Sequence, residues 1–167
     1  MKKHLLPLLL LIIGITSGGA ARSQEDQLAK RKAEIEASST LFYSNEYEFA
    51  AETMQPSGYY NRRMDPGYKI IVSKDSIICN LPYMGRAYAA PIGQTDNGIK
   101  FISTKFNYTY KNRNKSGWIA TIKPQDNNDV RTITLTILDN RSTYVTIISN
   151  NRQPISFSGE IIERGSR

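Results

Sequence analysis

From Tyr47 almost to the end of the chain, apolar and polar residues alternate with a period of two. Successive side chains of a β-strand point to opposite faces, so this alternation predicts strands with one buried face. The clearest run lies at residues 131–138, where Ile133, Leu135 and Ile137 alternate with threonines. Polar segments rich in glycine, proline, asparagine and aspartate separate the runs and predict turns. The pattern predicts about eight to ten short strands.

The residues expected to face the core lie on the apolar side of this alternation. They are Tyr47, Phe49, Ala51, Thr53, Tyr68, Ile70, Val72, Ile77, Cys79, Leu81, Ile99, Phe101, Ser103, Phe106, Tyr108, Tyr110, Trp118, Ala120, Ile122, Ile133, Leu135, Ile137, Val145, Ile147, Ile155, Phe157 and Ile161. Glu48 and Glu52 alternate with the first of these residues and are expected on the polar face. Residues 73–75 are expected to form the turn of a hairpin.

Between Glu25 and Phe42 the pattern changes to that of a helix. This segment is rich in good helix formers and contains no proline or glycine. Leu28, Ile35 and Phe42 are spaced seven residues apart and form a narrow apolar stripe. We expect the helix to lie against the domain surface or across one end of it. A partner-binding or membrane-surface helix is the alternative, although its polar face mixes charges of both signs.

The predicted strands follow one another through short connections, with no helix between them. This arrangement favours a closed or nearly closed antiparallel β-barrel, preceded by the one helix, because closure leaves no sheet edge exposed. A two-sheet β-sandwich is the alternative, since the number of strands is compatible with both.

The N-terminal residues have the pattern of a secretory signal peptide. Lys2, Lys3 and His4 precede the apolar run from Leu5 to Ile15, and small residues occupy most of the segment from Thr16 to Ala21. The apolar run is shorter than the roughly 20 residues that a transmembrane helix needs. We therefore expect an exported protein, periplasmic or extracellular, without a transmembrane span after signal cleavage.

Signal cleavage is expected after Ala21 or after Ser23, because both sites have small residues in the required places. With the second site, the predicted organisation is a signal peptide at 1–23, the helix and a linker at 24–45, the barrel at 46–163 and a tail at 164–167. Of the 22 basic residues, cleavage removes Lys2, Lys3 and Arg22, which leaves 19 against 15 acidic residues, a net charge of +4. Lys111, Arg113 and Lys115 are expected on a solvated face, and no nucleic-acid partner is expected, because no recognition motif accompanies them.

Several chemistries are excluded by the residue types present. His4 is the only histidine and would leave with the signal peptide, which removes histidine-based triads and histidine-ligated metals. Cys79 is the only cysteine and is expected to be a buried thiol without a disulfide partner. No spacing of acidic residues is typical of a calcium loop or a matched acid–base pair. We therefore expect no catalytic residues, no metal site, no cofactor and no enzymatic activity.

The stretch from Leu81 to Phe101 interrupts the alternation with two prolines and three glycines. Within it, Arg86 is flanked by tyrosines and small residues, so we expect its guanidinium to be partly buried and to need acceptors. It would bond carbonyls or a carboxylate such as Asp96, or it would face the barrel mouth and bind an anion. Arg152, in SNNRQP, has the same alternatives, and a solvated turn is the default expectation for it.

A small barrel either fills its interior with side chains or holds one small ligand. Ten tyrosines favour the second possibility, because a tyrosine combines an apolar face with a polar tip. The leading hypothesis is a non-enzymatic barrel that binds a small amphipathic or anionic ligand near Tyr83, Arg86, Tyr88 and Trp118. The alternatives are an interaction module of the cell envelope, which docks a protein partner through the helix or a sheet face, and a hydrolase that uses carboxylates alone.

Three segments, LPYMGRAYAAP, GIKF and SNNRQPISFSGEI, resemble those of DUF4251, a family of small exported bacterial proteins of unknown function. The similarity covers roughly Glu46 to Ile162. The resemblance implies a signal peptide, a helix and then a lipocalin-like antiparallel barrel, and it implies no activity and no catalytic residues. Met84 stands where a phenylalanine is expected in relatives, which suggests a packing position.

Overall fold

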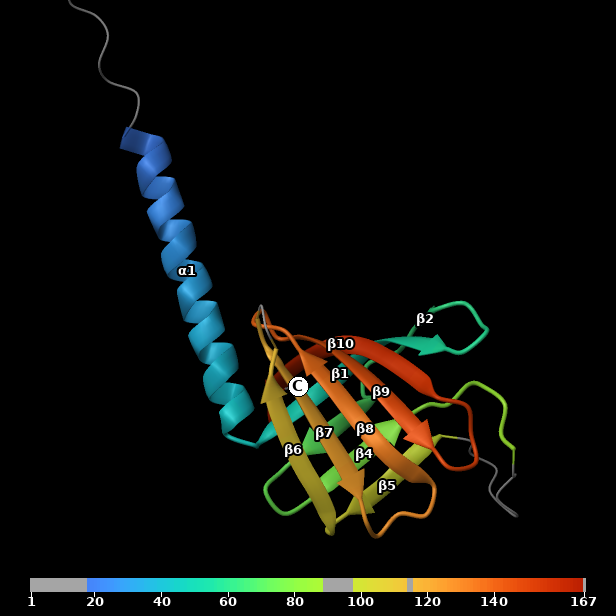
Figure 1. Cartoon of the computed structure of the whole chain (residues 1–167). Helices are drawn as coiled ribbons and strands as arrows, with labels where there is room; N and C mark the ends of the chain where they lie inside the picture. Colours follow the sequence, from blue (N-terminus) through green and yellow to red (C-terminus); the bar gives the residue numbers. More distant parts are fainter. Residues whose placement is uncertain (1–17, 89–97, 114–115, 167) are drawn as a thin grey trace, which may run out of the picture. The chain divides into compact units, whose positions relative to one another are not determined.

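The computed structural model describes residues 18–88, 98–113 and 116–166 (Figure 1). The chain divides into two compact units, Met1–Ala33 and Glu34–Arg167. Helix α1 (Gly18–Tyr43) begins in the first unit, and its last turns belong to the second. The predicted helix is confirmed, and it starts earlier than expected, before both predicted cleavage sites.

The strands of the described residues lie in the second unit and are consistent with the predicted alternation. They are β1 (Tyr47–Pro56), β2 (Arg62–Arg63), β3 (Lys69–Val72), β4 (Ile77–Leu81), β5 (Ile99–Ser103), β6 (Phe106–Asn112), β7 (Trp118–Pro124), β8 (Val130–Ile137), β9 (Ser142–Ser149) and β10 (Ile155–Glu163). Their order in the sheet is β5-β4-β3-β1-β10-β9-β8-β7-β6, and β2 pairs only with β1. Each pair of neighbouring strands in this order is antiparallel, so the prediction of a nearly closed antiparallel barrel is confirmed.

The two ends of the sheet order are β5 and β6, which are consecutive in the chain. Figure 1 shows them leaving their shared turn in different directions. Asp126 holds this turn: the Ser103 hydroxyl donates to its Oδ1, and the backbone N–H groups of Thr104 and Lys105 donate to its Oδ2 at 2.9 and 3.1 Å. These bonds, the Ser103 bond first, lower the pKa of Asp126 to about 2.

The first and last strands of the barrel pair with each other from Tyr47↔Glu163 to Pro56↔Ile155. The register shifts between Ala51 and Thr53, at a β-bulge opposite the Gly159 region. A Cβ atom on Gly159 would lie 2.0 Å from the Ala50 carbonyl oxygen, so only glycine permits this close pairing of β1 and β10.

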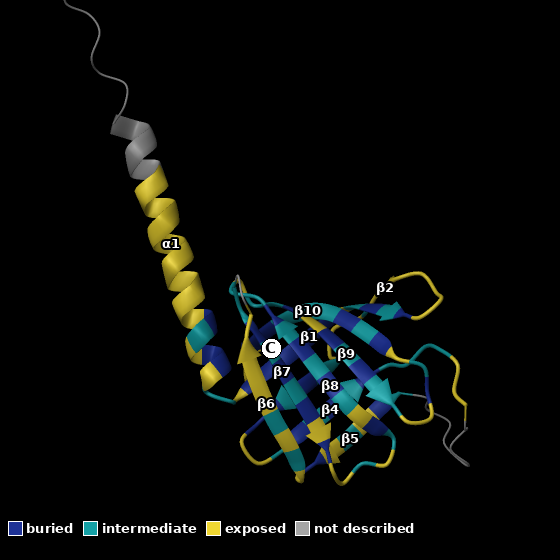
Figure 2. Ribbon diagram, in the orientation of Figure 1, coloured by how far each residue is buried: buried dark blue, intermediate teal, exposed yellow. Residues whose placement is uncertain are grey.

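The barrel interior is filled by one cluster of buried side chains contributed by α1 and by the strands of the barrel (Figure 2). The β3–β4 hairpin is confirmed, with Ile70 opposite Cys79 and Val72 opposite Ile77. Tyr110 departs from the expected core, because it lies on the end strand β6 and is 51% exposed.

Glu48 lies on the face opposite to Tyr47 and Phe49, as predicted, but it is buried there and not solvated. Its neighbours across the sheet are Ile71 on β3 and Ile162 on β10, which exclude water on both sides. Both carboxylate oxygens accept a hydrogen bond from the Lys69 ammonium group at 3.1 Å. This pairing makes the buried charge tolerable.

Candidate functional site

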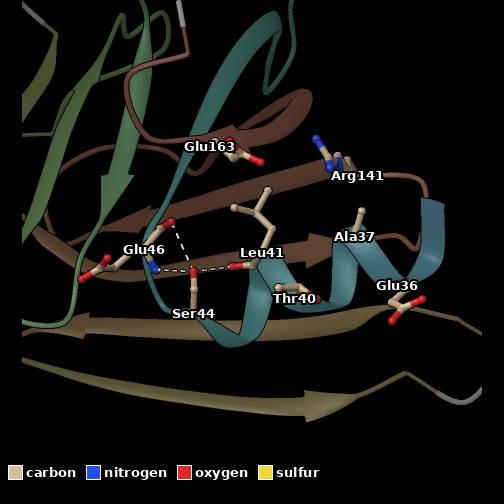
Figure 3. Close-up of a pocket in the computed structure, with 8 residues that line it drawn as sticks. All are labelled: Glu36, Ala37, Thr40, Leu41, Ser44, Glu46, Arg141 and Glu163. Atoms are coloured by element: carbon tan, nitrogen blue, oxygen red, sulfur yellow. Dashed lines mark hydrogen bonds between the residues drawn. The ribbon is translucent and has the colours of Figure 1, made fainter. Parts of the chain in front are cut away.

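An open pocket of about 570 Å³ lies beside the end of α1, and we call it the helix-end pocket (Figure 3). Four structural elements meet there: the last turns of α1, the link to β1, the β8–β9 turn and the end of β10. The residues that line it are Glu36, Ala37, Thr40, Leu41, Ser44, Glu46, Arg141 and Glu163.

The link between α1 and β1 is fixed by Ser44. Its hydroxyl donates to the Leu41 carbonyl at 2.7 Å and accepts a hydrogen bond from the backbone N–H of Glu46 at 3.0 Å. Asn45 adopts a left-handed conformation (φ 54°) that ends the helix. This turn holds Leu41 and Glu46 on the same wall of the helix-end pocket (Figure 3).

The opposite wall is formed by Arg141, in the β8–β9 turn, and Glu163, at the end of β10. Arg141 also has a left-handed backbone (φ 68°), and its carbonyl accepts a hydrogen bond from the N–H of Ile161 at 3.0 Å. The backbone of the turn is therefore tied to β10. The strand alternation gave no signal for this pocket, because its residues come from helix turns and strand ends that are far apart in the sequence.

The rim of the helix-end pocket is acidic, with three glutamates and one arginine. Lys74 approaches Glu46 at 3.7 Å, but both side chains are largely exposed, so this ion pair is weak. Figure 3 shows the carboxylates of Glu36, Glu46 and Glu163 pointing in separate directions. A catalytic pair of carboxylates would have to converge on one substrate bond.

Three of the predicted ligand-binding residues lie in the loop after β4, and two of them contact the β9–β10 loop through the backbone. The Tyr83 hydroxyl lies 2.9 Å from the Arg86 carbonyl and 3.2 Å from the Gln153 carbonyl. The N–H of Gln153 donates to the Arg86 carbonyl at 3.1 Å. The N–H of Tyr88 donates to the Asn151 carbonyl at 2.7 Å, while its side chain is exposed.

The expectation that Arg86 is partly buried is wrong, because Arg86 is exposed and contributes its backbone to these contacts. Its expected carboxylate partner, Asp96, lies outside the described residues. The expectation of a solvated Arg152 is also wrong: this residue is only 7% exposed. The buried guanidinium of this region therefore belongs to the β9–β10 loop.

Arg152 is held by a carboxylate, a carbonyl and an aromatic ring. Its Nε lies 3.2 Å from Asp129 Oδ2, and its Nη1 donates to the Gly98 carbonyl at 3.4 Å. Its guanidinium carbon lies 5.1 Å from the centre of the Tyr83 ring. Burial raises the pKa of Tyr83, which keeps its hydroxyl protonated as a donor. We call Tyr83, Asp129, Arg152 and Gln153 the arginine corner. Its contacts connect the loop after β4, the β7–β8 connection and the β9–β10 loop, which is a structural role.

Trp118, the fourth predicted residue, is not part of the arginine corner. It pairs with Ile137 at one end of β8, whereas Asp129 precedes the other end. Its ring stacks on Phe42 with centroids 4.8 Å apart, and its Nε1 donates to the Tyr43 hydroxyl at 3.1 Å. Trp118 thus anchors the last turn of α1, and the four predicted residues do not form one site.

Two other groups with potential chemistry are buried in the barrel. Tyr47 and Tyr108 share a hydrogen bond of 3.2 Å between their hydroxyls, and burial raises the pKa of both. Burial also raises the pKa of the Cys79 thiol, as expected for a core residue. These groups are protonated at neutral pH, and the Cys79 thiol is a poor nucleophile.

In the described part of the chain, no three His, Cys, Asp or Glu side chains are grouped closely enough to hold a metal ion. Nor does any helix in those residues have an apolar stretch long enough for a membrane crossing.

No functionally curated protein matches the chain. The crystal structure of a DUF4251 family protein from Bacteroides eggerthii has a similar fold, with a TM-score of 0.62 and 13% sequence identity over 78% of this chain and 88% of that chain. Identity at this level supports a likeness of fold alone. The sequence profile of DUF4251, a domain of unknown function, matches residues 29–161, which confirms the resemblance that the sequence suggested. The chain therefore belongs to the DUF4251 family.

Proposed function

We propose that this protein is an exported, non-enzymatic binding protein that holds a small amphipathic ligand in the helix-end pocket. The single observation that carries this proposal is the pocket itself. Its volume of about 570 Å³ falls within the roughly 300–1,000 Å³ typical of ligand sites. Leu41 and Ala37 supply apolar surface, and charged side chains surround it.

A site beside the strand ends fits the packing of the described residues better than a site inside the barrel. The interior is occupied by the buried cluster, whose largest members include Phe49, Phe157 and Leu135. Interiors packed in this way leave few voids larger than a water molecule. The proposed ligand therefore contacts α1 and the strand ends, and not the barrel axis.

The charge of the rim determines which ligand is favoured. Three glutamates against one arginine repel an anion and attract a cation. The proposed ligand is thus an amphipathic molecule with a cationic or neutral polar group, and an anionic ligand is disfavoured at this site.

The absence of catalysis is supported by the directions of the three rim carboxylates, which do not converge (Figure 3). Export is supported by the charged, apolar and small-residue segments at the start of the sequence.

The test uses two probes that differ only in the head group, dodecyltrimethylammonium and dodecyl sulfate, below their micelle concentrations. The expected result is that the cationic probe shifts the NMR amide signals of Leu41, Glu46 and Glu163, and that the anionic probe does so much more weakly. Glu163→Gln should weaken binding of the cation by a few-fold, because it removes one of three attracting charges.

Ala37→Trp provides a steric test, because Ala37 is exposed and lines the helix-end pocket. It should abolish the shifts, whereas Ala33→Trp, one turn earlier on α1 and outside the pocket, should leave them unchanged. Equal binding by both Trp variants, or no shift with either probe, would contradict the proposed function.

A further inference from the structure

Strand β6 ends the sheet order, and only one of its edges is paired, with β7. Backbone hydrogen bonds just beyond the two ends of β6 show which of its residues are hydrogen-bonded to β7. The N–H of Gln125 donates to the Lys105 carbonyl, and the N–H of Arg113 donates to the Gly117 carbonyl. Hydrogen-bonded pairs alternate with non-bonded pairs in an antiparallel ladder, so the odd-numbered residues of β6 bond to β7.

The even-numbered residues of β6 therefore direct their N–H and C=O groups away from the sheet. These residues are Phe106, Tyr108, Tyr110 and Asn112, and we call this row the β6 edge. Within the described ranges, no backbone or side-chain hydrogen bond to these groups is present. Unpaired backbone groups must meet water or another strand, so the β6 edge is a template for strand addition.

The sequence around the β6 edge carries charges of a single sign. Residues 98–124 contain six basic residues and no acidic residue. The basic residues are Lys100, Lys105, Lys111, Arg113, Lys115 and Lys123. The chain as a whole has a net charge of +7, so this segment accounts for most of it. The nearest acidic residue in the sequence after the segment, Asp126, is engaged by the β5–β6 turn.

Side chains on both faces of β6 can also contact an added strand. Thr109 and Lys111 are exposed on the outer face, and Lys123 on β7 lies on the same face, opposite Asn107. On the inner face Tyr108 is half-buried, and the half-exposed ring of Tyr110 packs against Phe42 and Tyr43 at the end of α1. An added strand would thus meet basic groups on the outer face and the exposed part of the Tyr110 ring on the inner face.

We propose that the β6 edge binds an extended acidic peptide segment, which adds to the sheet as a further strand. A second copy of this chain is a poor occupant, because antiparallel pairing of two β6 strands along their full length would set Lys105 of each copy opposite Arg113 of the other. A nucleic acid would use the charge but not the alternating donors and acceptors of the backbone. An acidic strand uses both features.

The probe is the capped heptapeptide acetyl-Glu-Val-Glu-Thr-Glu-Val-Glu-amide, titrated into the full chain. Its binding should slow hydrogen exchange of the Tyr108 and Tyr110 amides at least about tenfold, and it should weaken as salt rises from about 0.05 to about 0.5 M. The same peptide with lysine in place of glutamate should not bind. Absence of any slowing with the acidic peptide would overturn the proposal.

Backbone pairing is tested separately from charge. Two forms of the acidic peptide carry N-methyl groups on alternate residues, one form for each edge of the strand. The form methylated on the edge that faces β6 cannot donate and should lose at least about tenfold in affinity, because its hydrogen bonds are lost. Asn112→Pro, which removes an N–H of the β6 edge without removing a bond to β7, should also weaken binding.

Charge is tested by the double variant Lys111→Glu/Lys123→Glu. Its matched control is Arg62→Glu/Arg63→Glu, which makes the same change of net charge on β2, a strand that pairs only with β1. The first variant should lose at least about tenfold in affinity and the control much less. If both methylated peptides bind like the parent, or if oligothymidine binds more tightly and displaces the peptide, the site is a general polyanion site and the proposal is wrong.

Discussion

Among the described residues two charged side chains, Glu48 and Arg152, are buried, and each has an oppositely charged partner. Lys69 lies 3.1 Å from Glu48, and Asp129 lies 3.2 Å from Arg152. A buried ion pair adds little net stability, but removal of one partner leaves the other with an uncompensated charge. Removal of one partner should therefore lower the free energy of unfolding by more than the intact pair contributes to it.

Arg152→Ala should lower the free energy of unfolding by about 2 kcal/mol, because Asp129 loses its partner and the Tyr83 ring loses its cation. This figure lies below the cost for a fully buried pair, since the Asp129 side chain is 34% exposed. Urea denaturation measures the change.

The control is Arg86→Ala, an exposed arginine in the facing loop. It should change the free energy of unfolding by less than about 0.5 kcal/mol. An equal loss in the two variants would show that the arginine corner is not held by the buried guanidinium.

The sequence did not indicate which of these two arginines is buried. Arg86 has aromatic and small neighbours in the chain, which suggested burial, whereas Arg152 stands among asparagines and glutamine. Burial of Arg152 depends on Tyr83 and Asp129, which come from the loop after β4 and the β7–β8 connection. The residues next to Arg152 in the sequence do not predict a contact with segments so far away along the chain.

At the scale of elements, the turn between β5 and β6 depends on one carboxylate from another connection. Asp126 accepts hydrogen bonds from the Ser103 side chain and from two backbone N–H groups of the turn. These bonds favour the ionised form, so the pKa of Asp126 is lowered in the folded state.

The stability that Asp126 contributes should depend on pH. Because its folded pKa, about 2, is below the ordinary aspartate value of 3.8, the contribution is fully present above about pH 4. It is lost as pH falls through about 2, when the folded state is also protonated. Asp126→Asn should therefore be less stable than the original chain at neutral pH, and the difference should shrink between pH 4 and pH 2.

Urea midpoints across this pH range measure the effect. Asp139→Asn is the control, because no side-chain hydrogen bond of Asp139 is described. A constant difference between the original chain and Asp126→Asn from pH 7 to pH 2 would contradict the role of the carboxylate.

Most elements could be predicted from the sequence, because strand alternation and helix propensity are local properties. Ile133, Leu135 and Ile137 are buried as predicted, since their period of two matches the strand geometry. The helix-end pocket was not predicted, because residues at the ends of helices and strands do not recur at a regular spacing in the sequence. The exposure of Tyr110 was missed for a related reason: a strand pattern does not tell which strand ends the sheet.

At the scale of the whole molecule, pairing of β1 with β10 unites the two ends of the barrel domain. The barrel lies in the unit Glu34–Arg167, whereas the described residues of the first unit, 18–33, belong to α1. The barrel should therefore depend on its last strand and not on the N-terminal half of α1.

A chain that begins at Glu34 should unfold cooperatively at the same urea midpoint as the full chain. A chain that ends at Gln153 lacks β10, which leaves β1 and β9 without a shared neighbour, and should not unfold cooperatively. Circular dichroism during urea denaturation measures both.

A third chain, ending at Glu163, is the control, because it keeps all of β10 and loses only the tail. It should lose little stability, since the described tail side chains make two hydrogen bonds, from Arg164 to the Ser73 hydroxyl and from Ser166 to the Glu163 carbonyl. A cooperative transition in the chain that ends at Gln153 would show that the barrel does not need the β1–β10 pairing.

The β1–β10 pairing also bears on how the chain is made. On the order of 100 residues separate the two strands, so at about 5–20 residues per second β1 leaves the ribosome some 5–20 s before β10. During that interval the β10-facing edge of β1 has no native partner, and the many contacts between distant segments make barrel closure slow. The newly made chain is therefore most prone to pairing with other chains before its last nine strand residues, Ile155–Glu163, are in place.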